Sequence, residues 1–146
     1  MRQSVSTQRA KRTPGSHVVE LRIPSSAEWV GVARLAIAGI ASRLQFSIED
    51  IEDLKLAVAE ACTSYIQSAR EDGEICMSAE VAADRITITV DAPGQHVEAL
   101  HGTALQTESS TGGLGLFLIR TLMDEVSYEL DSQAGTKLVM TKLLRT

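Results

Sequence analysis

The chain has 146 residues and a mass of 15.7 kDa, with 44% hydrophobic and 23% charged residues and a formal net charge of −5. This size and composition are typical of one globular domain with a sizeable core. No apolar run is long enough to cross a bilayer, and the basic N-terminus lacks the apolar segment of a secretory signal. We therefore exclude a membrane-spanning or secreted protein and expect a cytoplasmic one.

The charge is unevenly distributed along the chain. Residues 1–16 contain four of the 14 basic residues and no acid, so 10 basic and 19 acidic residues remain, and residues 17–146 carry a formal net charge of −9. An acidic body argues against direct nucleic-acid binding. We interpret residues 1–16 as a disordered basic tail and residues 17–146 as a single domain. Cys62 and Cys76 lack metal-ligand spacing and are interpreted as buried free thiols.

The first half of the chain predicts a strand and two helices. Val19, Leu21 and Ile23 recur at every second position before Pro24, which is typical of a strand. Helical spacing then predicts a first core-facing stripe, formed by Val30, Ala33, Ile37, Ile40 and Leu44. Ser47, with Asp50 three residues later, predicts the start of a second helix. Its stripe is Ile51, Leu54, Val58, Ala61 and Tyr65.

The second half predicts a sheet interrupted by one helix. Alternating apolar residues predict a hairpin over residues 75–90, and the aperiodic residues 91–111 form a loop of a length that is usually functional. A third helix then runs to about Glu125, before strands near 126–131 and 136–143. This order predicts an α+β two-layer sandwich, in which a mainly antiparallel sheet is covered on one face by three helices.

Two segments carry residues suited to nucleotide chemistry. Gly112-Gly113-Leu114-Gly115-Leu116 opens the third helix. Glycine permits close backbone approach to a ligand, and a helix N-terminus offers free N–H groups to a phosphate. On the second helix, Leu56, Glu60 and Ser64 share one face. A carboxylate among small apolar residues either faces water or is placed for proton transfer or metal binding.

These segments occur in an order that resembles a known family. The helix Asp53-Leu54-Lys55-Leu56-Ala57-Val58-Ala59-Glu60-Ala61-Cys62-Thr63 precedes a strand ending in Asp91, then the glycine segment, and finally Gly135-Thr136 and Val139-Met140-Thr141-Lys142. From Val18 to Leu144 the chain resembles the RsbW/SpoIIAB family of anti-sigma factors, which are protein-serine kinases of the GHKL ATPase superfamily. The resemblance implies a GHKL (Bergerat-type) ATP-binding fold.

The resemblance also implies roles for individual residues. Glu60 matches the general base that activates the attacking hydroxyl, and Asp91 matches the aspartate that binds the adenine amino group. Residues 95–111 match the ATP lid, and Thr136 matches a residue near the adenine. The phosphate-contacting turn corresponds to Gly112, Gly113, Leu114, Gly115 and Leu116. ATP and Mg²⁺ are the implied cofactors, because phosphoryl transfer depends on positioning, a cation and backbone donors.

The chain departs from the family pattern at three ligand positions. Ser64 stands where the family has the Asn that ligates Mg²⁺, which leaves Glu60 and a shorter hydroxyl as metal ligands. Ser68 replaces a histidine. Pro93 replaces a glycine, with Gly94 following as the candidate binding residue, and proline removes an N–H from the adenine-side loop.

The resemblance implies an RsbW-type switch protein. Such a protein sequesters an alternative, sigma-B-type sigma factor and phosphorylates a serine of an anti-anti-sigma (STAS-domain) partner, in control of stress-response transcription. A homodimer is implied, with the helix face around Trp29 and Val32 as a candidate contact surface. A catalytically degenerate, nucleotide-free anti-sigma module is the alternative, and a histidine-kinase catalytic domain is a less favoured third. We assign no role to His17, His96 or His101.

Overall fold

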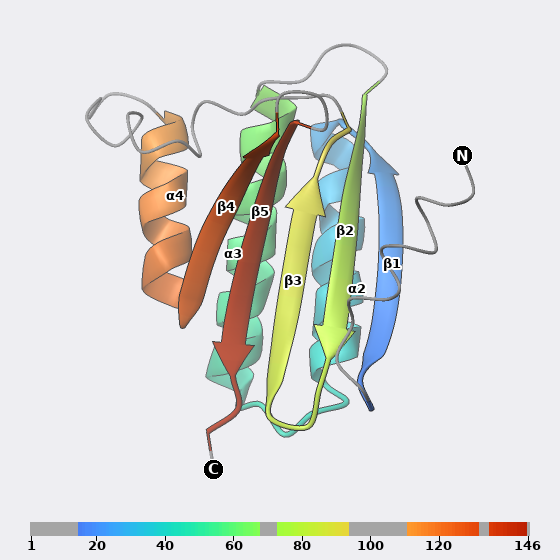
Figure 1. Cartoon of the computed structure of the whole chain (residues 1–146), viewed down its shortest axis with the longest axis vertical. Helices are drawn as coiled ribbons and strands as arrows, with labels where there is room; N and C mark the ends of the chain where they lie inside the picture. Colours follow the sequence, from blue (N-terminus) through green and yellow to red (C-terminus); the bar gives the residue numbers. More distant parts are fainter. Residues whose placement is uncertain (1–14, 68–72, 94–110, 132–134, 146) are drawn as a thin grey trace.

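A computed structural model describes residues 15–67, 73–93, 111–131 and 135–145. The chain forms a five-stranded antiparallel sheet with the strand order β1-β2-β3-β5-β4 (Figure 1). Its strands are β1 (His17–Pro24), β2 (Glu74–Val81), β3 (Arg85–Asp91), β4 (Glu125–Asp131) and β5 (Gly135–Leu143). Three α-helices cover one face of this sheet, as the two-layer prediction required: α2 (Val30–Ala41), α3 (Ile48–Gln67) and α4 (Thr111–Leu122).

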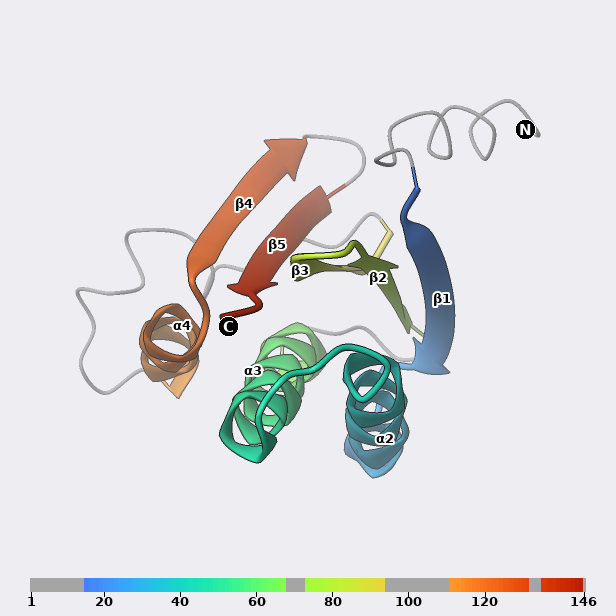
Figure 2. The same ribbon diagram turned by 90° about the horizontal axis from the view of Figure 1, so that it is seen from below.

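The helices lie side by side beneath the sheet. A short 3-10 helix, η1 (Ala27–Trp29), leads from β1 into α2. Seen from below, α2 lies under β1 and β2, α3 lies under the middle of the sheet, and α4 lies at the β4 edge (Figure 2). The opposite face of the sheet carries no helix among the described residues.

The core lies between these layers and follows the predicted stripes. On α3, Leu54, Val58, Ala61 and Tyr65 are fully buried, because their spacing of three or four residues turns them to the sheet. Ile75, Met77 and Ala79 on β2 and Ile86, Ile88 and Val90 on β3 meet them through strict alternation. The predicted N-cap is confirmed, since the Asp50 N–H donates to Ser47 Oγ at 3.0 Å.

The third helix differs from its prediction at both ends. It begins at Thr111, so the glycines form its first turn instead of a turn before it, and it ends at Leu122 instead of Glu125. The Asp124 N–H donates to Thr141 O at 3.0 Å, which commits the chain to the sheet just after the helix. Pairing with β5 therefore ends the helix earlier than its apolar pattern does.

Of the predicted N-terminal tail, residues 1–16, the structure describes only the last two residues. Residues 1–14 lie outside the described residues. Ser16 is buried, and its hydroxyl donates to Glu80 Oε2 at 2.7 Å on β2.

Candidate functional site

The predicted site residues that the structure describes gather at one end of the molecule. The C-terminal half of α3, the start of α4, the end of β3 and the start of β5 all lie at this end (Figure 1). This convergence follows from the topology, because β5 runs antiparallel to β3 and therefore starts where β3 stops.

Glu60 and Ser64 are neighbours on α3, one turn apart. Ser64 is 3% exposed, and its hydroxyl donates to Glu60 O at 3.0 Å. Serine in a helix commonly makes this bond to the preceding turn. The hydrogen of the hydroxyl is thereby occupied, while the oxygen keeps its lone pairs.

Gly115 on α4 faces both residues. A Cβ at position 115 would lie 3.3 Å from Glu60 Oε1 and 3.5 Å from Ser64 Oγ. The absence of a side chain is therefore what leaves room for the Glu60 carboxylate against α4. The structure brings together Glu60, Ser64 and Gly115, three residues that the resemblance assigned to one site.

The first turn of α4 presents the remaining residues of the glycine segment. Gly112, Gly113 and Leu114 belong to this turn, where backbone N–H groups have no partner within the helix. Such a turn, with the positive end of the helix dipole, suits an anion. The Leu116 side chain is fully buried in the core, so only its backbone is available to a ligand.

Tyr65 connects the two strand ends beside this helix pair. Its hydroxyl, which has one proton, lies 2.9 Å from Val90 O and 2.6 Å from Thr136 O. Thr136 is fully buried and lies at the start of β5, and its place near the adenine stays a prediction. Burial raises the pKa of the Tyr65 hydroxyl, with the Asp91 charge acting in the same direction, so it remains a neutral donor.

Asp91 ends β3 next to this connection. It pairs with Cys76 on β2 and with Lys137 on β5. Burial raises the pKa of its carboxyl above the ordinary value, and the Lys137 charge opposes that shift. Lys137 thus favours the ionised form, which accepts a hydrogen bond from an amino group.

Several predicted positions lie outside the described residues. These are Gly94, Ser68, residues 95–110 of the lid, His96 and His101. Pro93 is described and exposed, and His17 begins β1 at the sheet edge opposite α4.

A cation would need ligands from beyond a single cluster of side chains in the described ranges. No group of three or more His, Cys, Asp or Glu side chains there could hold a metal ion. Glu60 and Ser64 both turn oxygen atoms toward Gly115, and oxygen is the donor that Mg²⁺ prefers. Their chemistry fits Mg²⁺ if nucleotide phosphates and water supply the other ligands.

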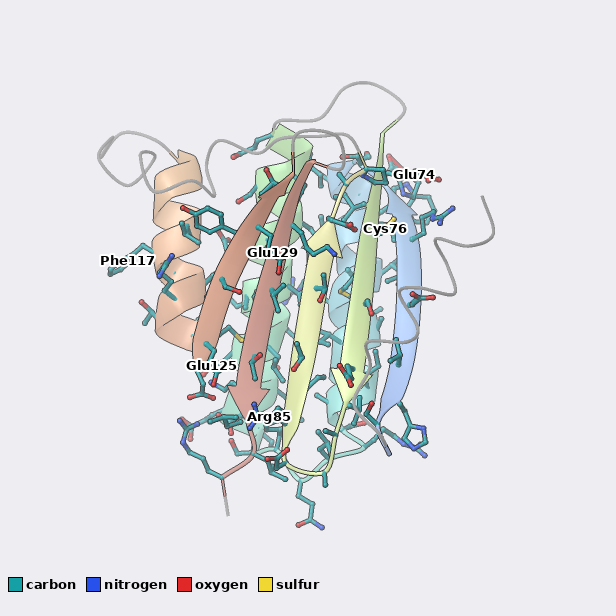
Figure 3. The ribbon with its side chains drawn as sticks, viewed as in Figure 1. Glu74, Cys76, Arg85, Phe117, Glu125 and Glu129 are labelled. Carbon is teal, nitrogen blue, oxygen red and sulfur yellow. The ribbon has the colours of Figure 1, made fainter. Side chains whose placement is uncertain are left out.

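The two cysteines are free thiols, and neither adds chemistry to the site. Burial raises the pKa of Cys62 to about 12, which keeps it protonated. Cys76 is half-buried on the sheet face that carries no helix (Figure 3), so the prediction of burial holds fully only for Cys62.

Exposed apolar side chains occur on the helices. Trp29 and Val32 are 41% and 40% exposed, and their role in contact stays a prediction. Leu35, which lies on α2 with Val32, is 74% exposed, and Phe117 points away from α4 (Figure 3). The sequence pattern did not predict a surface position for Leu35 or Phe117.

The sequence pattern also did not predict buried polar contacts for two residues in core positions, Tyr65 and Lys142. Tyr65 was assigned only to an apolar stripe, although a buried tyrosine hydroxyl usually finds a partner. Lys142 continues the inward-facing series of Leu138 and Met140 on β5 and is 6% exposed. A lysine in phase with buried strand residues is the signal that could have drawn attention to it.

Comparison with known proteins places the chain among relatives of similar sequence. The family model of the histidine kinase-like ATPase domain matches residues 23–142. The serine-protein kinase RsbW of Halalkalibacterium halodurans is 41% identical over 137 residues, which cover 87% of this chain and 83% of the relative. RsbW of Bacillus pumilus is 42% identical over 141 residues, with 87% and 86% covered. RsbW of Bacillus subtilis is 38% identical over 138 residues, with 86% and 85% covered.

No helix in the described part of the chain is long and apolar enough to cross a membrane. The fold, the site residues and the extent of these similarities lead to one conclusion. The chain belongs to the RsbW family of serine-protein kinases, within the histidine kinase-like ATPases.

Proposed function

We propose that this chain is an anti-sigma factor that binds an alternative sigma factor of the sigma-B type and, with Mg-ATP, phosphorylates a serine of an anti-anti-sigma partner. Through this exchange of partners it controls stress-response transcription. The observation that carries the proposal is the approach of Glu60 and Ser64 to Gly115 in the first turns of α4. A carboxylate base beside a phosphate-binding helix start is the arrangement that phosphoryl transfer needs.

In the proposed reaction, Glu60 accepts the proton of the serine hydroxyl as the oxygen of that serine bonds to the γ-phosphorus of ATP. The bond from the γ-phosphorus to the bridging oxygen breaks, and ADP leaves with its electron pair. Backbone N–H groups of residues 112–116 stabilise the charge on the transferred group. Mg²⁺ would neutralise the phosphate oxygens, held by Glu60 and, directly or through water, by Ser64.

We assign adenine recognition to the end of β3 and the start of β5, at the same end of the molecule as Glu60. Asp91 accepts a hydrogen bond from the adenine amino group, Thr136 lies near the ring, and Gly94 is the further candidate binding residue. Tyr65 supports this part indirectly, because its hydroxyl holds the carbonyls of Val90 and Thr136 together.

The first test is phosphate transfer from radiolabelled ATP to a purified STAS-domain protein from the same organism. We expect Glu60→Ala to abolish transfer while sigma-factor binding, measured by size-exclusion chromatography, is retained. Loss of both activities together would mean that α3 no longer folds, and transfer at the wild-type rate would rule out Glu60 as the base.

The alternative, a nucleotide-free anti-sigma module, is favoured by Ser64 and Pro93. Calorimetric titration with ATP and ADP, with and without Mg²⁺, distinguishes the two. Mg²⁺-dependent binding supports the kinase, and a strong gain of transfer in Ser64→Asn would identify a kinase weakened at its metal ligand. Absence of binding at millimolar nucleotide, unchanged in Ser64→Asn, would favour the module.

We also propose that the protein is a homodimer and that Trp29 at the end of η1, with Val32 and Leu35 on α2, contributes to partner contact. These residues recur every three positions and are all exposed. Sedimentation equilibrium of the wild type and of Leu35→Glu, with and without the sigma factor, would show whether this face serves the dimer, the sigma factor or neither.

A further inference from the structure

Lys142 is a buried lysine at the end of the molecule opposite the candidate site. It lies on the inner face of β5, and its side chain is 7% exposed. Its ammonium donates to Leu122 O at 2.6 Å and lies 3.5 Å from Asp53 Oδ2 and 3.7 Å from Asp50 Oδ1. We refer to Lys142, Leu122 O, Asp50 and Asp53 as the lysine clamp.

The clamp joins three elements through one charge. Burying an ammonium is unfavourable unless its donors are paired, and here β5 supplies the cation while α3 and α4 supply the acceptors. Leu122 is the last residue of α4, where carbonyls lack helical partners and the dipole is negative. Lys142 therefore caps α4 while its charge is balanced by the first turns of α3.

The position of the clamp along both helices relates it to the site. Leu122 lies seven residues after Gly115 on α4, and Asp53 lies seven residues before Glu60 on α3. Seven residues are about two helical turns, or about 10 Å. The helices run antiparallel, so the lysine clamp lies at one end of their packed interface and the approach of Gly115 to Glu60 and Ser64 lies toward the other.

Other contacts tie the C-terminal end of α4 to the same part of β5. Asp124 accepts from the Leu143 N–H at 2.7 Å and from the Arg145 guanidinium, and its own N–H donates to Thr141 O. These bonds hold the chain just after α4. Among the described residues, the lysine clamp joins this end of α4 to α3 through the charged side chain of Lys142.

We propose that Lys142 is a positioning residue for phosphoryl transfer, which sets the spacing of α4 from α3 and thereby the distance between the first turn of α4 and Glu60. The proposal rests on the proposed kinase function. It assigns Lys142 no contact with ATP or with the protein substrate.

The test compares Lys142→Met, which keeps the length and loses the charge, with Lys142→Arg, which keeps the charge. In the nucleotide-free protein we expect faster amide hydrogen exchange over residues 115–122 in Lys142→Met, with β2 and β3 unchanged. We also expect kcat for transfer to fall about tenfold or more, since small displacements of reacting groups have effects of this size. Lys142→Arg should keep most of the wild-type protection from exchange and most of the wild-type kcat.

Nucleotide affinity provides a readout that general destabilisation does not produce. Because the first turn of α4 would contact the terminal phosphates, Lys142→Met should lower ATP affinity several-fold more than ADP affinity. Ile37→Val, a conservative change at a fully buried position on α2, is the matched control for lost stability. It should leave the ratio of ATP to ADP affinity and the exchange of α4 unchanged.

The outcomes separate the clamp from the kinase. Unchanged exchange in α4, or faster exchange with unchanged kcat and affinity ratio, would overturn the positioning role. If the wild type neither binds ATP nor transfers phosphate, the proposed function fails. Hydrogen exchange alone then tests whether the clamp positions α4. Faster exchange of α4 in Lys142→Met, with recovery in Lys142→Arg, supports the clamp, and unchanged exchange in Lys142→Met overturns it.

Discussion

Gly115 is the residue whose size matters most at the candidate site. In Gly115→Ala, the new Cβ would meet Glu60 Oε1 at 3.3 Å, so the carboxylate must shift by a few tenths of an ångström. Alanine favours the helix by up to ~1 kcal/mol. We therefore expect the free energy of unfolding to change little, while transfer to the protein substrate falls at least about tenfold. Urea unfolding and single-turnover kinetics measure the two effects.

Gly39 on α2 supplies the matched control. It is exposed, and a Cβ there would meet nothing within 4 Å. Gly39→Ala should raise the free energy of unfolding by roughly 0.5–1 kcal/mol and leave transfer unchanged. Equal activity in both alanine variants would show that the room at position 115 is not needed.

Asp91 offers a prediction about ionisation. Burial raises the pKa of its carboxyl above 3.8, and the cation of Lys137, its neighbour across the strands, lowers it. Removing the cation in Lys137→Met should therefore raise the pKa further. Carbon-detected NMR titration of the Asp91 carboxyl would measure this, with Arg22→Met on β1 as a control that shifts Asp91 less. A fall of the pKa in Lys137→Met would contradict the assignment.

At the scale of elements, Tyr65 connects α3 to the ends of two strands. Tyr65→Phe would leave the carbonyls of Val90 and Thr136 without their shared donor in a buried place. We expect a loss of about 1–3 kcal/mol in the free energy of unfolding. Because Asp91 and Thr136 flank these bonds, ATP and ADP affinity should fall together. Thermal unfolding and calorimetry test this, and a fall in ATP affinity alone would contradict it.

Helices and strands were predictable from the sequence wherever one of their faces is buried in the core. The stripes of α3 and the alternation of β2 and β3 follow directly from burial against a single opposing layer. The ends of α4 were not predictable in this way. Glycines indicate a turn in sequence, yet the first turn of a helix tolerates them, and the stop at Leu122 depends on a backbone bond between Asp124 and Thr141.

At the scale of the whole molecule, the resemblance predicts site residues that lie on separate helices and strands. What it did not contain are the contacts between distant segments. The Tyr65 hydroxyl reaches Thr136 across 71 positions, and Lys142 reaches Leu122 across 20. Such contacts depend on β5 lying between β3 and β4, and a periodicity that repeats within one element carries no information about that strand order.

The carboxyl groups of Asp124 and Asp91 contribute to the pH dependence of stability with opposite signs. The Arg145 hydrogen bond lowers the pKa of Asp124 below 3.8, so Asp124 contributes stability above the unfolded value and loses it as pH falls through the folded value. Asp91 behaves in the opposite way. Its raised pKa means that the ionised form destabilises the fold, and this effect disappears as pH falls through the folded pKa.

Two isosteric variants separate these contributions. At pH 7, Asp124→Asn should lower the free energy of unfolding and Asp91→Asn should raise it. The Asp91 difference should shrink as pH falls toward 3.8, and the Asp124 difference only as pH falls below 3.8. Urea unfolding at several pH values gives the measurement, with Asp84→Asn as an exposed control that changes little. Asp91 would then be a carboxylate kept charged at a cost to stability, as expected of a ligand-binding group, and Asp124 one that holds the fold together. A shift of the same sign in both variants would contradict this division.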